Sequence, residues 1–532
     1  MAIQSKLLGD WVVGRAVSGV VQRSERQQDE SLLERTYVDA GVLPQLQNDN
    51  NQILYGRRGT GKSHILRLLG ILASRNPNQT SVYLDLRYLG SAQLMTDRSR
   101  SMTTRSVSVF RDLISAIQNQ LLDLATDPSR PEPGVGLEEV TALAEAVKGL
   151  ASTVSEREIT SERQASTSNK SGIDLKASSS GPSLGLSASD DESTSDKFTE
   201  HYRQVYEDTV IFSAVSFHLE EALRALKIRR LLLLLDEWIA IPLDVQPYVA
   251  EFLRRTVLPS QHFTLKIASL EHASRFSTLD QDESRIGFEL GGDIAANTDL
   301  DDYYVYERTP ARSTEIFGQL LFRHVHANLE DNYLLKNYHL QTHSDFIARI
   351  FDDPSTFQEL VRAGEGVVRD FLCIFTSAYF RAVQQGSSTI DLMSVEEAAL
   401  DWFETEKAPN LSGAQERVLQ TIVQNVIGTS HTHCFLLERS LAAHPMIRSL
   451  FDLRLIHLIR RGYVDYEEPG VRYNIYALDY GTYINLKRAN INKLEFDISK
   501  SLPRSPDRVA PFDDERTVRR VILDSLVLDG EG

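Results

Sequence analysis

Two cysteines, Cys373 and Cys434, are all that the 532 residues contain. So few thiols argue against a disulfide framework and favour a reducing compartment. The sequence also lacks any run of about 18 apolar residues, the length that a membrane-spanning helix needs. Its first residues show no charged cap before a long apolar run, so we expect no secretory signal. These absences predict a cytoplasmic protein with no membrane partner.

Net positive charge is missing as well, because the formal net charge is −17. Proteins that attract DNA non-specifically are usually basic, since neutralising phosphates supplies most of that affinity. Any DNA contact must therefore come from a local patch, from many subunits or from a partner. The length exceeds what one hydrophobic core usually supports, which predicts several folded units.

One motif has a specific chemical meaning. The short apolar run Ile53–Tyr55 precedes Gly-Arg-Arg-Gly-Thr-Gly-Lys-Ser, and a helical pattern follows it. This is the G-x-x-x-x-G-K-[ST] phosphate loop in its required context, after a strand and before a helix. Its glycines let backbone N–H groups face phosphates, its lysine reaches the β- and γ-phosphates, and its serine hydroxyl binds magnesium. The predicted nucleotide-binding residues are Gly56, Arg57, Arg58, Gly59, Thr60, Gly61, Lys62, Ser63 and His64.

A second motif is acidic, and its first acid, Asp236, lies 173 residues after Ser63. Five leucines, Leu231–Leu235, suit a strand of a parallel sheet that is buried on both faces. Asp236 and Glu237 follow at its carboxyl end, where ligands of such sheets sit. We expect Asp236 to hold magnesium through water, and Glu237 to orient or deprotonate the attacking water.

Changes in composition predict how the chain is organised. We expect a helical lead-in, an ATPase core with an insertion, a helical lid, a small domain and a tail. The ranges are 1–50, 51–305 with the insertion at about 95–200, 306–408, 409–490 and 491–532. Within the insertion, residues 152–196 are serine-rich and alternate as in a hairpin. We interpret them as a tolerated surface loop, the alternative being a loop that contacts a partner or a ring's central pore.

Together these motifs, with a further strand and a helical region, resemble the AAA+ ATPases. The likeness is strongest to the origin-recognition-type initiator branch and to related ATPases of bacterial defence. It covers residues 35–490 outside the insertion. It implies an α/β fold, with a parallel-sheet phosphate-loop core, a helical lid and a C-terminal winged-helix-like domain. It also implies ATP and Mg²⁺ as ligands and a homo-oligomeric assembly.

The resemblance suggests further site residues. Ser269 matches sensor 1, although an asparagine or threonine is more usual there and an ordinary strand-end serine is the alternative. Arg369 matches sensor 2 at the start of a lid helix, the alternative being a salt bridge at that helix start. Arg275 and Arg285 are arginine-finger candidates for a neighbouring subunit.

The C-terminal segment predicts helices followed by a β-ribbon. Pro445 and Gly462 bracket a helix, and strand, turn and strand follow over residues 463–476. A short helix over 435–441 and a tail helix over 515–526 are further candidates. This pattern resembles a winged-helix domain, which binds double-stranded DNA or docks a protein. The DNA-contact candidates are Arg448, Arg454, Arg460, Arg461 and Arg472.

Two functional hypotheses follow. The first is an ATPase that hydrolyses ATP to drive assembly or switching on DNA. The alternative is an ATP-gated sensor in a bacterial antiphage defence complex, which acts through an effector protein partner. A scaffold with a dead site is disfavoured because Lys62, Ser63, Asp236 and Glu237 are intact. A zinc site at His431–Cys434 is also disfavoured, because no second ligand pair is visible.

Overall fold

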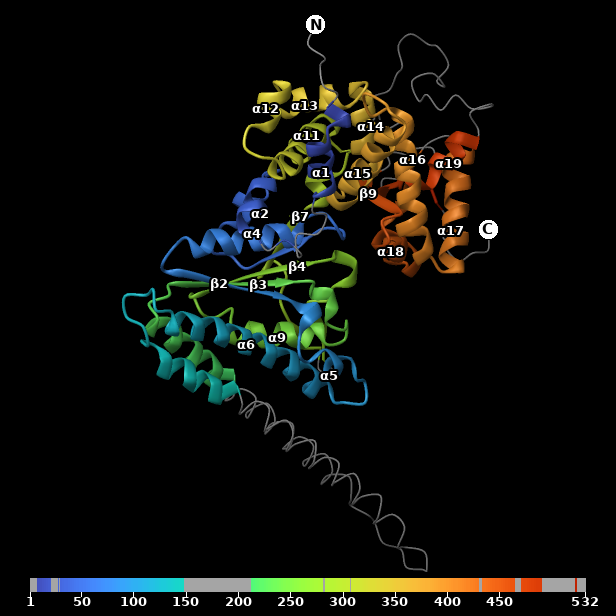
Figure 1. The fold of residues 1–532 in the computed structure, drawn as a ribbon. Helices are drawn as coiled ribbons and strands as arrows, with labels where there is room; N and C mark the ends of the chain where they lie inside the picture. The colour runs from blue at the N-terminus through green and yellow to red at the C-terminus, as the bar shows by residue number, and fades with distance from the viewer. Residues whose placement is uncertain are drawn as a thin grey trace, which may run out of the picture.

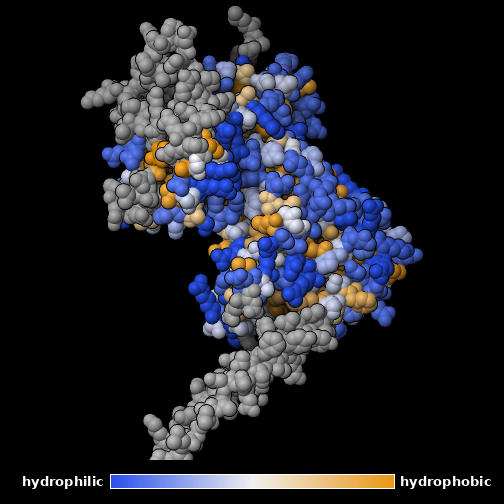
Figure 2. All heavy atoms as spheres, turned by 180° about the vertical axis from the view of Figure 1, so that it is seen from behind, coloured by the Kyte–Doolittle hydropathy of each residue, from blue (hydrophilic) through white to orange (hydrophobic). Residues whose placement is uncertain are grey.

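The computed structural model describes residues 7–20, 27, 29–147, 212–280, 283–306, 308–429, 433–464, 470–489 and 522–523. The serine-rich hairpin predicted over 152–196 lies outside these residues, as do His431 and Thr432. Within the described residues, no helix is both long and apolar enough to cross a membrane. Hydrophilic side chains cover most of the face seen in Figure 2, with smaller hydrophobic areas between them.

A five-stranded, all-parallel sheet forms the centre of the molecule (Figure 1). Its order is β2-β3-β4-β1-β7, so β1, which precedes the phosphate loop, is flanked on both sides. The strands are β1 (Gln52–Tyr55), β2 (Gln79–Asp85), β3 (Arg230–Asp236), β4 (Phe263–Ser269) and β7 (Ala295–Asp299). This arrangement confirms the predicted α/β fold and the strand expected at Leu231–Leu235.

Alternation along the strands builds two cores. Leu54 and Leu234 face α4 on one side of the sheet, whereas Leu233 and Leu235 face α6 and α9 on the other. The helices are α4 (Lys62–Ser74), α5 (Ala92–Thr96), α6 (Met102–Thr126), α9 (Gln246–Thr256) and α10 (Asp301–Tyr304). Residues 137–147 and 212–225 are also helical, and β5 (Ser277–Leu279) pairs with β6 (Arg285–Gly287) in a hairpin.

The N-terminal helices pack with the lid helices rather than beside the strands that follow them. Val13 and Val17 of α1 share one hydrophobic core with lid residues, and Tyr379 Oη donates a 3.0 Å hydrogen bond to the Leu8 carbonyl. The N-terminal helices are α1 (Trp11–Ser18), α2 (Glu30–Thr36) and α3 (Leu43–Leu46). The lid helices are α11 (Pro310–Ala327), α12 (Tyr333–Tyr338), α13 (His343–Ile350), α14 (Pro354–Gly364), α15 (Val368–Gln384) and α16 (Leu392–Trp402).

A three-stranded antiparallel sheet of order β8-β10-β9 follows. With α17 and α18 it forms what we call the C-terminal module, and α19 continues the chain. The elements are α17 (Gly413–Val423), β8 (Cys434–Glu438), α18 (Pro445–Asp452), β9 (Ile456–Val464), β10 (Arg472–Leu478) and α19 (Tyr480–Ala489). The expected helices followed by a β-ribbon are present, with β8 as an additional strand.

Three expectations for this region were wrong or lie largely outside the described residues. The helix predicted over 445–461 ends at Asp452, because Arg454 adopts a left-handed φ of 62° and β9 begins at Ile456. Ile456 and Leu458 of β9 face the core of the module, whereas Ile459 faces away from it. Because both faces of this strand are buried, its apolar pattern matches that of a helix. The helix predicted over 435–441 is β8 followed by a 3-10 turn. Of the predicted tail helix only 522–523 are described, and Ile522 bridges to Leu436 of β8.

Candidate functional site: the phosphate loop and the cavity beside it

The phosphate loop joins the end of β1 to the start of α4. Gly61 has a left-handed φ of 101° and caps α4, whose first residue is Lys62. Gly59 has a φ of 88°, and a Cβ there would lie 2.9 Å from Cβ of Arg369 and 3.0 Å from Cγ1 of Val367. Glycine is required at this position because the loop approaches the start of α15 so closely. The N-terminus of α4 thus opens at the carboxyl edge of the sheet, where its amides favour an anion.

Lys62 is buried below the loop and close to the acidic pair. Its Nζ donates hydrogen bonds to the carbonyls of Gly56 at 2.6 Å and Arg57 at 2.9 Å. Burial lowers the pKa of Lys62, and the nearby carboxylates of Glu237 and Asp236 oppose that shift. An ammonium group carries three donors, so one remains for a further acceptor.

The two acidic residues, Asp236 and Glu237, lie in different environments. Asp236 is 1% exposed, and it accepts hydrogen bonds from Tyr83 Oη at 2.7 Å and from the Glu237 amide at 2.9 Å. Glu237 has a left-handed backbone, with φ 55° and ψ 49°, which is rare for a residue with a side chain and is typical of functional sites. Burial and the neighbouring Asp236 raise the pKa of Glu237.

A cavity of about 350 Å³ extends from the loop toward the lid. We call its polar side the charged wall, formed by Arg58, Lys62, Arg87, Glu237 and Arg369. We call the uncharged part of the lining that lies on or directly after helices the neutral wall, formed by Leu32, Leu33, Thr36, His324, Asn328 and Leu372. His324 belongs to the neutral wall because burial lowers its pKa to about 3. Ser63 and His64 also line the cavity, and His64 Nε2 donates to the Leu33 carbonyl at 2.7 Å.

Arg369 lies where the sensor 2 expectation places it, in the first turn of α15. Its amide donates a 3.1 Å hydrogen bond to the Gly59 carbonyl, so the lid helix starts against the phosphate loop. The structure therefore brings Lys62, Ser63, Glu237 and Arg369 to one cavity.

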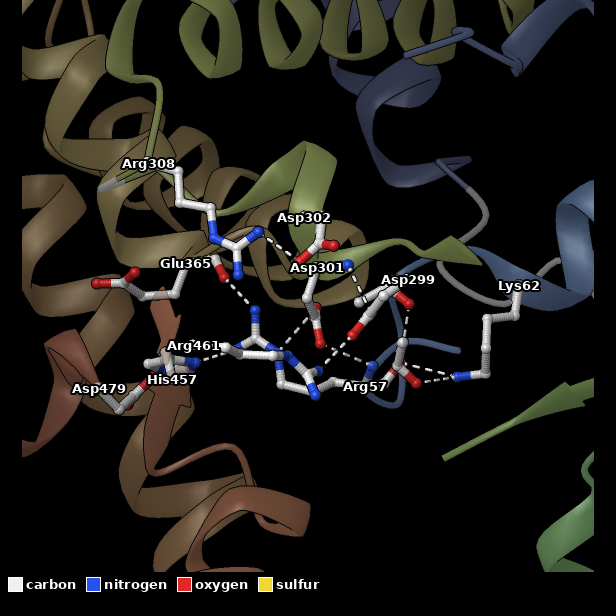
Figure 3. Close-up of polar contacts among 12 residues, drawn as sticks. Arg57, Lys62, Asp299, Asp301, Asp302, Arg308, Glu365, His457, Arg461 and Asp479 are labelled. Carbon is white, nitrogen blue, oxygen red and sulfur yellow. Dashed lines mark hydrogen bonds and ion pairs between the residues drawn. The ribbon is translucent and has the colours of Figure 1, made fainter. Parts of the chain in front are cut away.

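Other predicted residues do not line this cavity. Ser269 is buried at the end of β4 beside Tyr55 and shares a hydrogen bond with Ser274. Gly56 and Thr60 belong to the loop but do not line the cavity, and the Thr60 hydroxyl donates to the Arg57 carbonyl at 2.9 Å. Arg57 does not line the cavity, and its side chain extends from the loop toward Asp301 and His457 (Figure 3). Arg275 and Arg285 lie on the surface around the β5–β6 hairpin, where Arg285 pairs with Glu289 at 3.3 Å.

The DNA-contact candidates fall into two groups. Arg454 forms an ion pair with the buried Asp370, and Arg461 reaches Glu271 at 2.6 Å and Asp299 at 2.9 Å. These two arginines are therefore engaged with the rest of the chain. Arg448, Arg460 and Arg472 are exposed and form the second group; Arg461 is exposed as well, but it is held by its two ion pairs.

Sequence reasoning missed Arg87 and the whole neutral wall. Arg87 follows β2 in a 3-10 turn, pairs with Asp85 and lies 4.0 Å from Glu237 Oε1. The sequence signal that could have identified Arg87 is its position just after a strand of the core. The neutral wall combines residues of α2 with residues of α11 and α15, and no short motif joins them.

The residues present fit a nucleotide with its cation. Among the described residues no group of three or more His, Cys, Asp or Glu is placed to hold a metal ion by itself. Ser63 and Asp236 would hold Mg²⁺ only together with phosphate oxygens, which is how this ion usually binds at phosphate loops.

Comparisons with known proteins agree with the predicted resemblance. A family model described as ORC-CDC6-like matches residues 22–91, which include the phosphate loop and α2. No curated protein sequence matches the chain at a significant level. The match confirms the resemblance to origin-recognition-type ATPases over that segment.

Similar solved structures include Cdc6p from Pyrobaculum aerophilum, at 13% identity and a TM-score of 0.33, covering 90% of this chain and 97% of that one. ORC2 of Aeropyrum pernix, solved as ADPNP-ADP complexes, has 12% identity and a TM-score of 0.34, with 87% and 99% coverage. ORC1 of Aeropyrum pernix, solved in complex with DNA, has 13% identity and a TM-score of 0.29, with 90% and 96% coverage.

Proposed function

We propose that this protein is an AAA+-type ATPase that binds ATP at the phosphate loop and hydrolyses it with Mg²⁺ to drive assembly or switching. The observation that carries the proposal is the convergence of Lys62, Ser63, Glu237 and Arg369 on one cavity. A positive helix terminus, a lysine and an arginine suit a triphosphate. Glu237 lines the same cavity as the proposed acid–base group.

Each residue has a proposed task. Lys62 and Arg369 neutralise charge on the phosphates, and Arg369 reports their presence to the lid helix α15. A bound Mg²⁺ would neutralise charge on the phosphate oxygens. Glu237 orients the attacking water and accepts its proton, which requires the carboxylate form. Asp236 is already fixed by Tyr83 and would hold the cation through water.

Equilibrium binding of a fluorescent ATP analogue tests the proposal, with Lys62→Ala as the variant. Losing a charge-assisted contact of roughly 1.5–3 kcal/mol should weaken binding about 10- to 150-fold. Arg67→Ala on the same helix α4 is the control, because this residue does not line the cavity. Equal binding by wild type and Lys62→Ala would refute the site.

We further propose that the C-terminal module contacts double-stranded DNA through Arg448, Arg460 and Arg472. These exposed arginines supply local positive charge in a chain of net charge −17. Replacing all three by alanine should weaken DNA binding and reduce the salt dependence by roughly 0.9 per lost phosphate contact. Arg75, Arg100 and Arg224, replaced together, form the matched control. A DNA affinity that is the same for both triple variants would refute this assignment.

A second candidate is an ATP-gated sensor that acts through an effector protein. The observation in its favour is that Arg454 and Arg461 are already paired within the chain, which leaves a smaller basic surface. ATP hydrolysis measured with and without double-stranded DNA separates the two candidates. Stimulation by DNA supports the first, and indifference to DNA supports the second. Mass measurement in the same experiment tests the proposed homo-oligomer. The hydrolysis assay tests the arginine-finger roles of Arg275 and Arg285.

A further inference from the structure

Arg57 is the second residue of the phosphate loop, yet its side chain leaves the nucleotide cavity. It enters the junction between the loop, the lid and the C-terminal module (Figure 3), where its side chain is 1% exposed. Such a buried guanidinium is unfavourable unless its charge and its donors are matched.

Each of the three guanidinium nitrogens of Arg57 donates a hydrogen bond. Nε donates to Asp301 Oδ1 at 3.0 Å, and Nη2 donates to the Glu365 carbonyl at 2.7 Å. Nη1 donates to Nδ1 of His457, which lies on β9 of the C-terminal module. One side chain therefore joins the phosphate loop to α10, to the end of α14 and to β9.

The backbone of Arg57 connects this junction to the nucleotide site. Its amide donates to Asp301 Oδ2 at 3.2 Å, and its carbonyl accepts the 2.9 Å hydrogen bonds of both Lys62 Nζ and the Thr60 hydroxyl. A shift of Arg57 would therefore displace the acceptor that holds the phosphate-binding lysine.

The same polar contacts continue to the lid helix α15. His457 Nε2 donates to Asp479 Oδ1 at 3.1 Å, and Asp479 also accepts from Lys407 Nζ at 2.7 Å. Lys407 pairs with Asp370 at 3.1 Å, and Asp370 directly follows Arg369 in α15. A continuous line of buried contacts thus runs from the phosphate loop, through the C-terminal module, back to the lid arginine.

We infer that Arg57 is a positioning residue that makes nucleotide affinity depend on how β9 is docked. In this arrangement Arg57 holds the loop in the conformation that presents Lys62, and His457 holds Arg57. By thermodynamic reciprocity, a nucleotide that favours this loop conformation also tightens the docking of β9, and displacement of β9 weakens nucleotide binding. The inference rests on the proposed nucleotide binding and adds a regulatory input to that site.

Arg308 offers a matched control. It also fixes β9, because its Nε donates to the Ile459 carbonyl and its guanidinium pairs with Asp302. Neither Ile459 nor Asp302 belongs to the phosphate loop. Comparing Arg57 with Arg308 therefore separates loop positioning from the mere anchoring of the strand.

The test measures the Kd of a fluorescent ATP analogue for Arg57→Ala, His457→Ala, the double variant and Arg308→Ala. We expect Kd to rise about tenfold for Arg57→Ala, within the roughly 5- to 150-fold range of coupled sites. His457→Ala should raise it less and add nothing in the Arg57→Ala background. Arg308→Ala should raise Kd clearly less than Arg57→Ala at a comparable loss of thermal stability, because it loosens β9 without removing a contact of the phosphate loop. Arg57→Lys, which keeps the charge and loses the fork geometry, replaces Arg57→Ala if the latter does not fold.

Hydrogen exchange of the β9 amides supplies a readout that a purely structural role would not move. Saturating nucleotide should slow this exchange in wild type and in Arg308→Ala, but not in the Arg57 variants. Equal Kd changes for Arg57→Ala and Arg308→Ala, or an unchanged Kd for the Arg57 variants, would overturn the inference while leaving the proposed function intact. A wild-type protein that binds no nucleotide would overturn both.

Discussion

The charged and neutral walls of the cavity differ in composition and in origin. The charged wall is set by loops that follow β1, β2 and β3 and by the start of α15, so most of it stands at one edge of one sheet. The neutral wall comes from helices α2, α11 and α15, and it offers apolar surface and uncharged polar groups. Under the proposed function, this difference predicts a division of labour, in which the charged wall would bind and cleave the triphosphate and the neutral wall would contact the base.

The largest effect should come from Glu237→Gln, which keeps the shape of the charged wall and removes its base. General-base catalysis contributes roughly 10²- to 10⁴-fold, so hydrolysis should fall by about that factor. Binding of ATP should stay within about twofold, because the lost group acts on water rather than on phosphate. Single-turnover hydrolysis and equilibrium binding measure the two quantities, and parallel losses in both would contradict the assignment.

Arg369→Ala should weaken the charged wall from the lid side. We expect a loss of about 10- to 150-fold in kcat/KM, since a charge-assisted contact is worth roughly 1.5–3 kcal/mol. Steady-state kinetics measures this, with Arg349→Ala on α13 as a control arginine that does not line the cavity. An effect no larger than that of the control would mean that Arg369 only anchors the start of α15.

The pH profile tests the charged wall without changing its shape. Burial and Asp236 raise the pKa of Glu237 above its ordinary value of 4.5, and only the carboxylate accepts a proton. Hydrolysis should therefore decline on acidification at a higher pH than an ordinary glutamate gives, by about tenfold per pH unit below that pKa. The rate at saturating ATP measures it, and Glu237→Gln should lack this limb. A wild-type profile that is flat down to pH 4.5 would contradict the role of Glu237.

The smallest effect should come from the neutral wall. Asn328→Leu removes an uncharged polar group, and a neutral hydrogen bond is worth about 0.5–1.5 kcal/mol, or roughly 2- to 13-fold. This variant should change the ratio of ATP to GTP affinity, whereas Lys62→Ala should lower both affinities alike. Competition by inorganic triphosphate should not respond to Asn328→Leu. If it does, the two walls do not divide phosphate from base.

The sheet, the phosphate loop and the acidic pair were predictable because their signals are local. Gly56–Ser63 and Leu231–Glu237 each lie in one short stretch, and buried parallel strands are recognisable from continuous apolar runs. The lid helices were predictable for the same reason, from apolar spacing and caps.

Tertiary contacts decided what could not be predicted. Arg57 and Arg58 are neighbours of the same type, but one enters a buried junction and the other lines the cavity, which only their partners determine. Strand β9 carries apolar residues for both of its faces, so its pattern matches a helix as well as a strand. The neutral wall joins residues about 300 positions apart, and no single stretch of sequence carries its signal.

The packing of α1 and α2 against the lid also has a consequence for protein synthesis. A nascent chain that has emerged as far as residue 306 carries the phosphate loop and both acidic residues, but not α11 or α15. Its first helices then lack the lid partners of Val13 and Val17, and the cavity lacks Arg369 of the charged wall and His324, Asn328 and Leu372 of the neutral wall. Because domains generally fold from the N-terminus during translation, capacity for nucleotide should arise late, once the ribosome has released α15. If the proposed function holds, an incomplete chain would bind nucleotide only weakly until its lid helices have emerged.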